Sequence, residues 1–371
     1  MNILVDRIAG SLYGLLIGDA LGCPVEQWTP GQIAAEYGRL TEMVEPTGRW
    51  RPCGLHSDDG QQALALCDAL LVDPLEPERA FSSLLVDLLQ AAPKRRFGLH
   101  RGTGKNFRAT VLALAGGAEP HEAGQPSSGN GVAMLIAPAA YIWHGDMERL
   151  RDVVVRVGLV KQRDERGIAA AGAVAFVVAH GLVHGGFADL DEAGLLAFTR
   201  SVETAVSEQL GHATRGVFSA ALARMLAART APRAEVLAGI VEEASKTSAY
   251  PMQPGSGYSV ASVVTSIYLV LVSDSYETAV TDVVNLGDDA DTTGAMVGGM
   301  AGAAFGRVGL PKRWVEALVA RGALDPRIEA LAGGEGVAQP GKIRPLCEME
   351  AEWCALQDRP KKSPLTTSPS R

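Results

Sequence analysis

Hydrophobic residues recur with helical spacing along most of this chain. Within residues 3–21, Ile8, Leu12 and Leu15 follow the i, i+4, i+7 spacing of a helix with one apolar face. Further helical patterns cover residues 60–71, 109–118, 147–161, 165–185, 189–210, 213–228, 233–245, 255–272, 274–287 and 290–306. Residues 153–160, VVVRVGLV, are rich in β-branched side chains, yet no regular series of strands and no fixed-period repeat occurs. The patterning therefore predicts an all-α fold in one compact multi-helix domain.

The bulk composition is that of a globular protein whose interior is built from small residues. Of the 371 residues, 47% are hydrophobic, 20% are charged and 42 are glycine, whereas aromatic residues make up 5%. An interior of Ala, Gly, Leu and Val is therefore expected. The net charge of −8 argues against a general nucleic-acid binder and leaves room only for a local basic patch.

The cysteines and the apolar segments indicate a cytoplasmic protein without a membrane anchor. The five cysteines are scattered, without a CxxC pair, as expected for buried thiols in a reducing compartment: Cys23, Cys53, Cys67, Cys347 and Cys354. The first apolar run carries Asp6, Arg7 and Asp19, unlike a signal peptide. The longest apolar run begins at Ile168, contains His180 and is short for a membrane span.

The composition changes after about residue 335, where Gly, Pro, Lys and Ser dominate. This change predicts one domain over residues 1–345 and a flexible C-terminal tail over residues 346–371. The final segment, RPKKSPLTTSPSR, is expected to be disordered.

An acidic cluster precedes the last strongly apolar helix. Asp288, Asp289 and Asp291 lie beside Thr292 and Thr293. Clustered carboxylates repel one another, so a compact site needs a cation or protons. Oxygen ligands of this kind suit Mg²⁺, Mn²⁺ or Ca²⁺. The alternative is an acidic N-cap on a buried helix, which would explain one aspartate more readily than three.

The helix after this cluster carries Gly294, Gly298, Gly302 and Gly306, four residues apart on one face. Each interior glycine costs a helix about 1 kcal/mol relative to alanine. A face of glycines therefore predicts that another backbone packs very close to this helix.

A second acidic cluster, Ser57, Asp58 and Asp59, lies at the start of another amphipathic helix. Helix capping explains Ser57 alone, but two adjacent aspartates suggest ligands as well. Two such clusters in one chain favour a single shared metal site over two unrelated caps. Glu26 lies in the loop after the first helix, where a lone glutamate is usually solvated.

Two glycine-containing loops are candidates for substrate binding. Residues 94–108, KRRFGLHRGTGKNFR, combine cationic side chains with Gly102 and Gly104, which suits phosphates as well as it suits a solvated surface loop. No P-loop motif is present. The second loop offers free amides in a tight turn, or is a plain turn before a helix; its residues are Ser127, Ser128, Gly129, Asn130 and Gly131. Tyr258, in a later glycine turn, completes the candidate set.

Four ordered blocks resemble the ADP-ribosylglycohydrolases, a family that includes the dinitrogenase-reductase-activating glycohydrolases. The blocks are GLLIGDALGCPVE, SDDGQQALAL, SSGNGVAM and NLGDDADTTGAMVGGMAGA. The resemblance covers most of residues 5–320, and the order and spacing of the blocks make it specific. It implies an all-α domain with two divalent cations, Mg²⁺ or Mn²⁺, in a central cleft.

The resemblance also implies roles for single residues. The metal ligands would be Ser57, Asp58, Asp59, Asp289, Asp291 and Thr292. Asp288 stands where the family often has glycine and is expected outside the ligand set. The turn at residues 127–131 would line the ADP-ribose site. The implied reaction is hydrolysis of the bond between ADP-ribose and a protein side chain or a small conjugate, at the ribose anomeric carbon. Glu26, Asp58 and Asp59 are candidates for the general base.

The chain departs from the family pattern at Gly60, Leu135, Val160 and Lys161, where Thr, Arg, Thr and His are common. None of these changes removes a predicted ligand, but they leave the cleaved linkage open. One alternative is a catalytically weak protein that binds ADP-ribose or a partner enzyme. Another is a di-metal hydrolase of a different ribosyl compound.

Overall fold

A computed structural model describes residues 2–45, 52–319, 321–333 and 343–356 of the chain. The predicted all-α fold is confirmed, because these residues form helices and only two isolated β-bridges occur among them. In chain order the α-helices are α1 (Ile3–Gly22), α2 (Pro30–Tyr37), α3 (Asp58–Val72), α4 (Pro77–Gln90), α5 (Lys105–Ala115), α6 (Pro120–Ala123), α7 (Ala137–Trp143), α8 (Met147–Lys161), α9 (Glu165–His184), α10 (Glu192–Leu210), α11 (Val217–Ala228), α12 (Arg233–Ser245), α13 (Ser259–Val272), α14 (Tyr276–Val284), α15 (Ala290–Phe305), α16 (Lys312–Ala317), α17 (Asp325–Leu331) and α18 (Ile343–Leu356).

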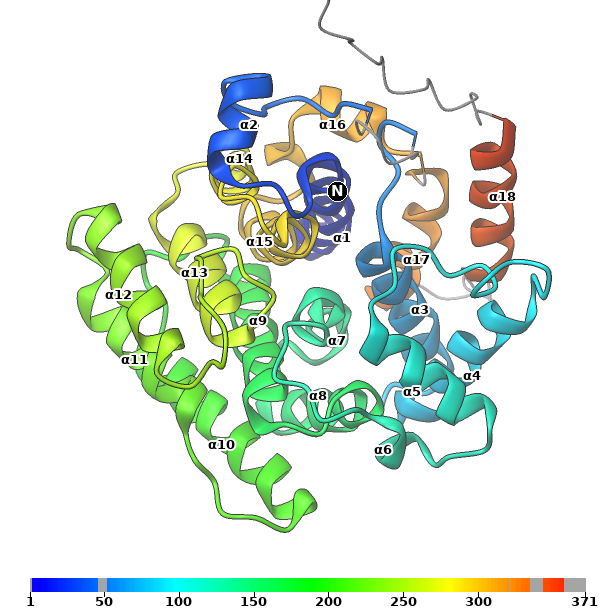
Figure 1. The fold of residues 1–371 in the computed structure, drawn as a ribbon, viewed down its shortest axis with the longest axis horizontal. Helices are drawn as coiled ribbons and strands as arrows, with labels where there is room; N and C mark the ends of the chain where they lie inside the picture. The colour runs from blue at the N-terminus through cyan, green and yellow to red at the C-terminus, as the bar shows by residue number, and fades with distance from the viewer. Residues whose placement is uncertain (1, 46–51, 320, 334–342, 357–371) are drawn as a thin grey trace, which may run out of the picture.

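Helices α1 and α15 pack against each other at the centre of the fold (Figure 1). Their contact is made by glycines of both helices: Gly14 meets the backbone of Gly298, and Gly18 meets that of Gly294. A Cβ atom at any of these four positions would overlap a carbonyl oxygen of the other helix. The glycine face predicted from the sequence is therefore confirmed, and its partner is a second glycine face on α1.

This packing is antiparallel, since residues near the end of α1 meet residues near the start of α15. Gly22 contacts the backbone of Ala290, whereas Gly10 contacts that of Gly302. The C-terminal end of α1 thus lies beside the acidic start of α15. The central pair thereby fixes one wall of the candidate site.

The remaining helices surround the central pair. Helices α9, α13 and α14 pack on α15, and α10 to α12 lie outside them, while α3 to α6 form the opposite side of the molecule (Figure 1). Two apolar helical segments, Ile3–Val25 and Glu165–His184, have the length and composition of membrane spans, but 100% and 83% of their apolar windows are buried within the fold. They are therefore core helices of this domain.

Among the boundaries that differ from the sequence predictions, two bear on the candidate site and on the end of the domain. Helix α5 begins at Lys105 rather than at residue 109, so the last part of the basic loop is helical. Helix α18 continues to Leu356, so residues 346–356 are not the start of a flexible tail. This helix packs on α3 and α4 and buries Cys347 and Glu350, which gives it a place in the domain. The segment RPKKSPLTTSPSR lies outside the described residues.

Candidate active site

The two acidic clusters, far apart in the sequence, meet in one cavity of about 510 Å³. Asp58 and Asp59 begin α3 on one side, and Asp289, Asp291 and Thr292 begin α15 on the other. The cavity is lined by Glu26, Asp58, Asp59, Gln62, Gly102, Gly104, Lys105, Asn106, Phe107, Ser127, Gly129, Asn130, Gly131, Met134, Lys161, Gln162, Asp289, Asp291 and Thr292. The structure therefore brings together residues from all four sequence blocks.

The start of α3 is held by a capping residue and by a carboxylate from α1. Ser57 caps the helix: its hydroxyl accepts a hydrogen bond from the Asp59 amide at 3.2 Å and donates one to Asp59 Oδ2 at 2.8 Å. The carboxylate of Asp19 accepts bonds from the amides of Ser57 at 2.7 Å and Gly60 at 2.8 Å. Ser57 is buried and does not line the cavity, so its observed contact is with Asp59.

The start of α15 separates Asp288 from the other aspartates. Asp288 has a φ of +58°, in the left-handed region, which explains why glycine suits this position. Its side chain accepts a hydrogen bond from Ser256 Oγ at 3.0 Å and does not line the cavity. By contrast, Asp289 accepts a bond from Asn130 Nδ2 at 2.6 Å, and Asp291 accepts one from the Thr292 amide at 3.0 Å.

The grouped carboxylates raise one another's pKa values. Burial is the largest cause that raises the pKa of Asp59, and the charges of neighbouring aspartates raise it further. Burial also raises the pKa of Asp291, with Asp59 as the next cause. The pKa of Asp289 is raised to about 6 by burial, although the bond from Asn130 lowers it. The cavity therefore concentrates negative charge that needs a counter-ion or protons.

The donor atoms of this cavity fit a hard divalent cation. Asp59 Oδ1 is buried and has no hydrogen-bond partner within the described part of the chain. One donor atom from each of Asp19, Cys23 and Asp291 lies within 4.8 Å of the others, although of these three only Asp291 lines the cavity. Carboxylate and hydroxyl oxygens dominate the set, as Mg²⁺ and Mn²⁺ prefer. An orphaned carboxylate oxygen among like charges is the environment that a cation would satisfy.

The glycine turn at residues 127–131 forms part of the cavity wall, with one exception. Gln162 Nε2 fixes the turn by donating to the carbonyls of Ser127 at 3.1 Å and Gly129 at 2.9 Å. The carbonyl of Ser128 accepts bonds from the amide and hydroxyl of Ser259 instead, and Ser128 does not line the cavity.

Tyr258 lies next to the turn but outside the cavity wall. It forms an isolated bridge with Gly129, and its hydroxyl lies 2.8 Å from Thr247 Oγ1 and 3.3 Å from Arg166 Nη1. Its position supports the turn rather than presenting the ring to the cavity.

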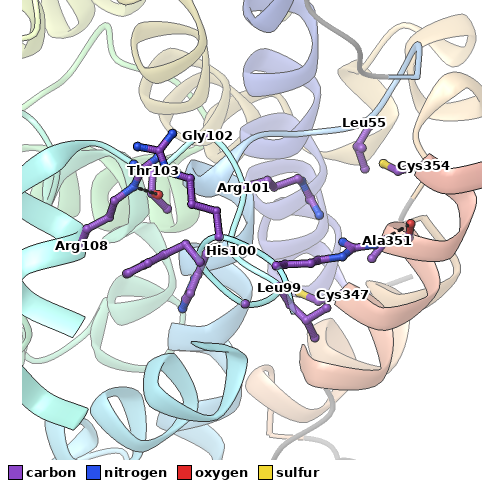
Figure 2. Close-up of a pocket in the computed structure, with 14 residues that line it drawn as sticks. Leu55, Leu99, His100, Arg101, Gly102, Thr103, Arg108, Cys347, Ala351 and Cys354 are labelled. Carbon is purple, nitrogen blue, oxygen red and sulfur yellow. Dashed lines mark hydrogen bonds between the residues drawn. The ribbon is translucent and has the colours of Figure 1, made fainter. Parts of the chain in front are cut away.

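The basic loop is divided between two cavities. Gly102, Gly104 and Lys105 line the cavity with the aspartates. A separate cavity of about 390 Å³ also reaches Gly102, and its wall includes Cys347, Ala351 and Cys354 of α18. Figure 2 shows the residues that line it. Four basic residues of the loop line that second cavity: Arg95, Arg96, Arg101 and Arg108. Arg101 is held there by Glu350 at 2.6 Å and by the carbonyl of His56 at 2.9 Å, so it does not face the aspartates.

Lys161 is a cavity residue that the sequence analysis did not select. Its ammonium group donates hydrogen bonds to Gln62 Oε1 and to the carbonyl of Gly131, and it lies 5.2 Å from the ring centre of Phe107. Burial lowers its pKa to about 8, against the charge of Asp58, which raises it. The sequence did carry a signal for this residue: Lys161 ends the largely apolar run VVVRVGLV, at a position where the family commonly has histidine.

Asp19 and Gln62 were also missed. Asp19 holds the start of α3, and Gln62 donates a hydrogen bond to Asp58 Oδ2 at 2.9 Å. Both are fully buried polar residues on apolar helices. Burial of a polar side chain indicates a functional or structural role, but it is seen only in the structure and cannot be derived from the periodicity of the sequence.

Comparison with known proteins gives consistent results. The sequence model of a family described as ADP-ribosylglycohydrolase matches residues 1–341. The ADP-ribosyl-[dinitrogen reductase] glycohydrolase of Rhodospirillum rubrum is 27% identical over 330 residues, which cover 84% of this chain and 90% of that protein. The ADP-ribosylarginine hydrolase Tri1 of Pseudomonas putida (strain GB-1) is 26% identical over 322 residues, covering 84% and 74%.

A solved structure has the same fold. It is an ADP-ribosylglycohydrolase-related protein complex, and it matches with a TM-score of 0.65 at 23% sequence identity. The match covers 90% of this chain and 99% of that chain. At this low sequence identity, the match shows that the two proteins share a fold and says nothing about a shared activity.

Proposed function

Because this chain belongs to the ADP-ribosylglycohydrolase family, we propose that it is a hydrolase that cleaves the glycosidic bond between ADP-ribose and a modified target. One observation supports this above the others: the carboxylates of α3 and α15 share a cavity with the turn at residues 127–131. A cavity of about 510 Å³ is within the usual size range of a small-molecule site.

The proposed cofactors are two divalent cations, Mg²⁺ or Mn²⁺. The side chains that would hold them are Asp58, Asp59, Asp289, Asp291 and Thr292. Ser57, whose hydroxyl bonds Asp59 Oδ2 at 2.8 Å, would orient that ligand. When bound, divalent cations polarise substrate oxygens and lower the pKa of a water molecule.

In the proposed hydrolysis, water supplies a hydroxyl group to the ribose anomeric carbon and a proton to the departing group. Glu26 is our candidate for the general base, in preference to Asp58 and Asp59. It lines the cavity from a loop and is partly exposed, so it can approach a substrate water, whereas both aspartates begin a helix and are almost fully buried. Asp58 and Asp59 would then serve to bind cations.

The ADP part of the substrate would lie against the two glycine-containing loops. Lys105, at the start of α5, offers a cation to the phosphates, and Gly131 offers its backbone amide. The amide of Asn130 already donates to the carbonyl of Gly257 at 3.1 Å, so it holds the turn in place instead. The proposed partner is an ADP-ribosylated protein or a small ADP-ribose conjugate in the cytoplasm. Since the Pseudomonas putida relative is an ADP-ribosylarginine hydrolase, ADP-ribosyl-arginine is the first substrate to test.

The test is to incubate metal-free protein, with and without Mg²⁺ or Mn²⁺, with ADP-ribosyl-arginine, ADP-ribosyl-serine and ADP-ribosylated nucleic acid, and to measure released ADP-ribose. Release from at least one of them, only with metal and absent in Asp289→Asn, is the expected result. Binding of ADP-ribose without release from any conjugate would identify a binding protein instead. Cleavage of another ribosyl compound alone would indicate a different hydrolase.

A further inference from the structure

A second group of possible metal ligands lies at the far end of α9, outside the active-site cavity. His180 and His184 are one turn apart on this helix, and Asp189 follows in the loop before α10. His180 Nε2 lies 3.5 Å from Asp189 Oδ1, and His184 Nδ1 lies 3.3 Å from Asp189 Oδ2. One donor atom from each residue lies within 4.8 Å of the other two.

The buried nitrogen of His180 is an independent sign that something is bound here. His180 is only 8% exposed, and its Nε2 atom has no hydrogen-bond partner among the residues that the structure describes. The distance of 3.5 Å to Asp189 is too long for a good hydrogen bond. Leaving a buried polar atom without a partner costs about 1–3 kcal/mol. A metal ion bound to the imidazole nitrogen would satisfy it.

The spacing of the donor atoms matches a tetrahedral site. With metal–ligand bonds of about 2.0–2.2 Å, neighbouring donor atoms of a tetrahedron lie about 3.3–3.6 Å apart. The two measured histidine–aspartate separations, 3.5 Å to Oδ1 and 3.3 Å to Oδ2, fall in this range. They involve the two different oxygens of the carboxylate, so one oxygen reaches both nitrogens after a rotation of the exposed Asp189 side chain. His184 and Asp189 have exposed side chains, 46% and 68%, so a water molecule can reach the fourth position.

We propose that His180, His184 and Asp189 form a second metal site that takes Zn²⁺ or a similar transition-metal ion. Two imidazoles and one carboxylate suit Zn²⁺, Co²⁺ or Ni²⁺, whereas Mg²⁺ prefers oxygen ligands alone. The site is structural: it ties the end of α9 to the loop that leads into α10. It does not depend on the proposed hydrolase activity, because none of the three residues lines the active-site cavity.

The neighbouring groups are compatible with this role. Arg7 is the nearby cation, and it is occupied by the carbonyls of Leu182 and Val183, at 3.0 Å and 2.8 Å. The two imidazole rings stack with centres 4.2 Å apart and planes inclined by 14°, which fits two neutral rings better than two cations. Because the lone pair of a ring nitrogen lies in the ring plane, binding one shared ion requires the half-exposed His184 ring to turn out of this stack. The competing explanation is a histidine pair that shares protons with Asp189 and binds no metal.

The experiment is calorimetric titration of Zn²⁺ into metal-free, full-length protein with excess Mg²⁺ present to occupy the oxygen-rich cavity. The parent and Asp289→Asn should both bind one Zn²⁺ with the same affinity. His184→Ala should lose at least about tenfold in affinity, as should Asp189→Asn. His121→Ala is the matched control, since His121 is an exposed histidine 3.9 Å from Glu122 and outside this group.

Two further readouts separate loss of a ligand from loss of folding. Circular dichroism should be unchanged in His184→Ala, because that side chain is exposed. Co²⁺ bound to the parent should give the visible absorption of a tetrahedral site, and His184→Ala should remove it. Equal Zn²⁺ affinity in the parent and His184→Ala, or no Zn²⁺ binding to Asp289→Asn, would overturn the proposal.

Discussion

At the scale of single residues, the cavity is defined by carboxylates whose charges are not balanced by the protein. Asp59 and Asp291 are almost fully buried, and after burial the charge of Asp59 is the next cause that raises the pKa of Asp291. Lys161 is a buried cation in the wall of the same cavity, and burial lowers its pKa to about 8. The carboxylates should therefore respond as a unit to a bound cation, because no single one of them can be ionised independently of the rest.

The first prediction concerns this coupling. Asp58→Asn and Asp289→Asn should each reduce the rise in melting temperature that Mg²⁺ or Mn²⁺ produces in the parent, since metal binding stabilises the folded state by linkage. The double variant should lose little beyond either single variant. Asp288→Asn is the control, because its side chain bonds Ser256 away from the cavity. Additive losses in thermal shift assays would mean that the clusters bind cations separately.

The second prediction concerns pH and His100. Burial is the main cause that lowers the pKa of this histidine from 6.5 to about 4. Its unfolded form takes up a proton as the pH falls below 6.5, whereas the folded form remains neutral until about pH 4. The free energy of unfolding should therefore fall by up to about 3 kcal/mol over this window on account of His100.

The measurement is urea denaturation at pH 7 and pH 4.5 of the parent, His100→Gln and His121→Gln. The His100 variant should lose less stability on acidification than the parent, because glutamine does not titrate. His121 is exposed, so its variant should follow the parent. An equal acid-induced loss in the parent and His100→Gln would contradict the assignment.

At the scale of elements, the central contact of α1 with α15 determines where the acidic clusters lie. The third prediction compares two adjacent glycines of α15. A Cβ at Gly298 would overlap the carbonyl of Gly14, whereas a Cβ at Gly299 would lie 3.6 Å from its nearest neighbour, in ordinary contact. Gly298→Ala should thus destabilise the protein by about 1–3 kcal/mol or more through overpacking. Gly299→Ala should be neutral or stabilising by up to about 1 kcal/mol.

Chemical denaturation of the two variants gives the comparison directly, because both substitutions add one methyl group within the same helix. Gly298→Ala should also weaken the metal-induced stabilisation, since separating the two helices displaces the start of α15. If both variants were as stable as the parent, the close approach of the helices would not hold.

The sequence predicted those helices whose periodic apolar positions are also the positions buried in the structure. Periodicity was sufficient for α1, α8 and α9, and the glycines of α15 revealed a close helix partner. The sequence did not reveal which helix that partner was, because pairing depends on contacts between distant segments. For the same reason it could not show that Arg101 turns toward Glu350, which lies far away in the sequence.

At the scale of the whole molecule, α18 is the segment whose role the sequence least suggested. It follows a stretch rich in glycine and proline, and composition predicted that it would belong to a flexible tail. Its Glu350 is nevertheless fully buried and lies 3.0 Å from His56 Nε2 and 2.6 Å from Arg101 Nη1. These contacts connect the C-terminal helix to the residue that precedes Ser57, and thus to the acidic start of α3.

The last prediction tests this connection. Burial raises the pKa of Glu350, but the positive charge of Arg101 and the contact with His56 together outweigh it and lower the pKa to about 2. Removing its charge would leave buried partners uncompensated, which costs about 3–5 kcal/mol for a buried pair. Glu350→Gln should therefore lower the free energy of unfolding by about this amount and reduce the Mg²⁺-induced stabilisation. Glu348→Gln, on the same helix, removes a half-exposed surface pair with Arg344 and should change stability by less than about 1 kcal/mol.

Two shortened chains extend the comparison from the residue to the helix. A chain that ends at Leu356 retains all of α18 and should match the full-length protein in melting temperature and in metal response. A chain that ends at Pro345 loses the helix with Glu350 and should be at least as destabilised as Glu350→Gln, because Arg101 and His56 lose the same partner. Equal stability of the two shortened chains, measured by thermal denaturation with and without Mg²⁺, would show that α18 is dispensable. The difference in melting temperature between the two shortened chains measures the contribution of the whole helix. The effect of Glu350→Gln, with Glu348→Gln as the control, measures the contribution of the buried charge, and the remainder belongs to the apolar face of the helix.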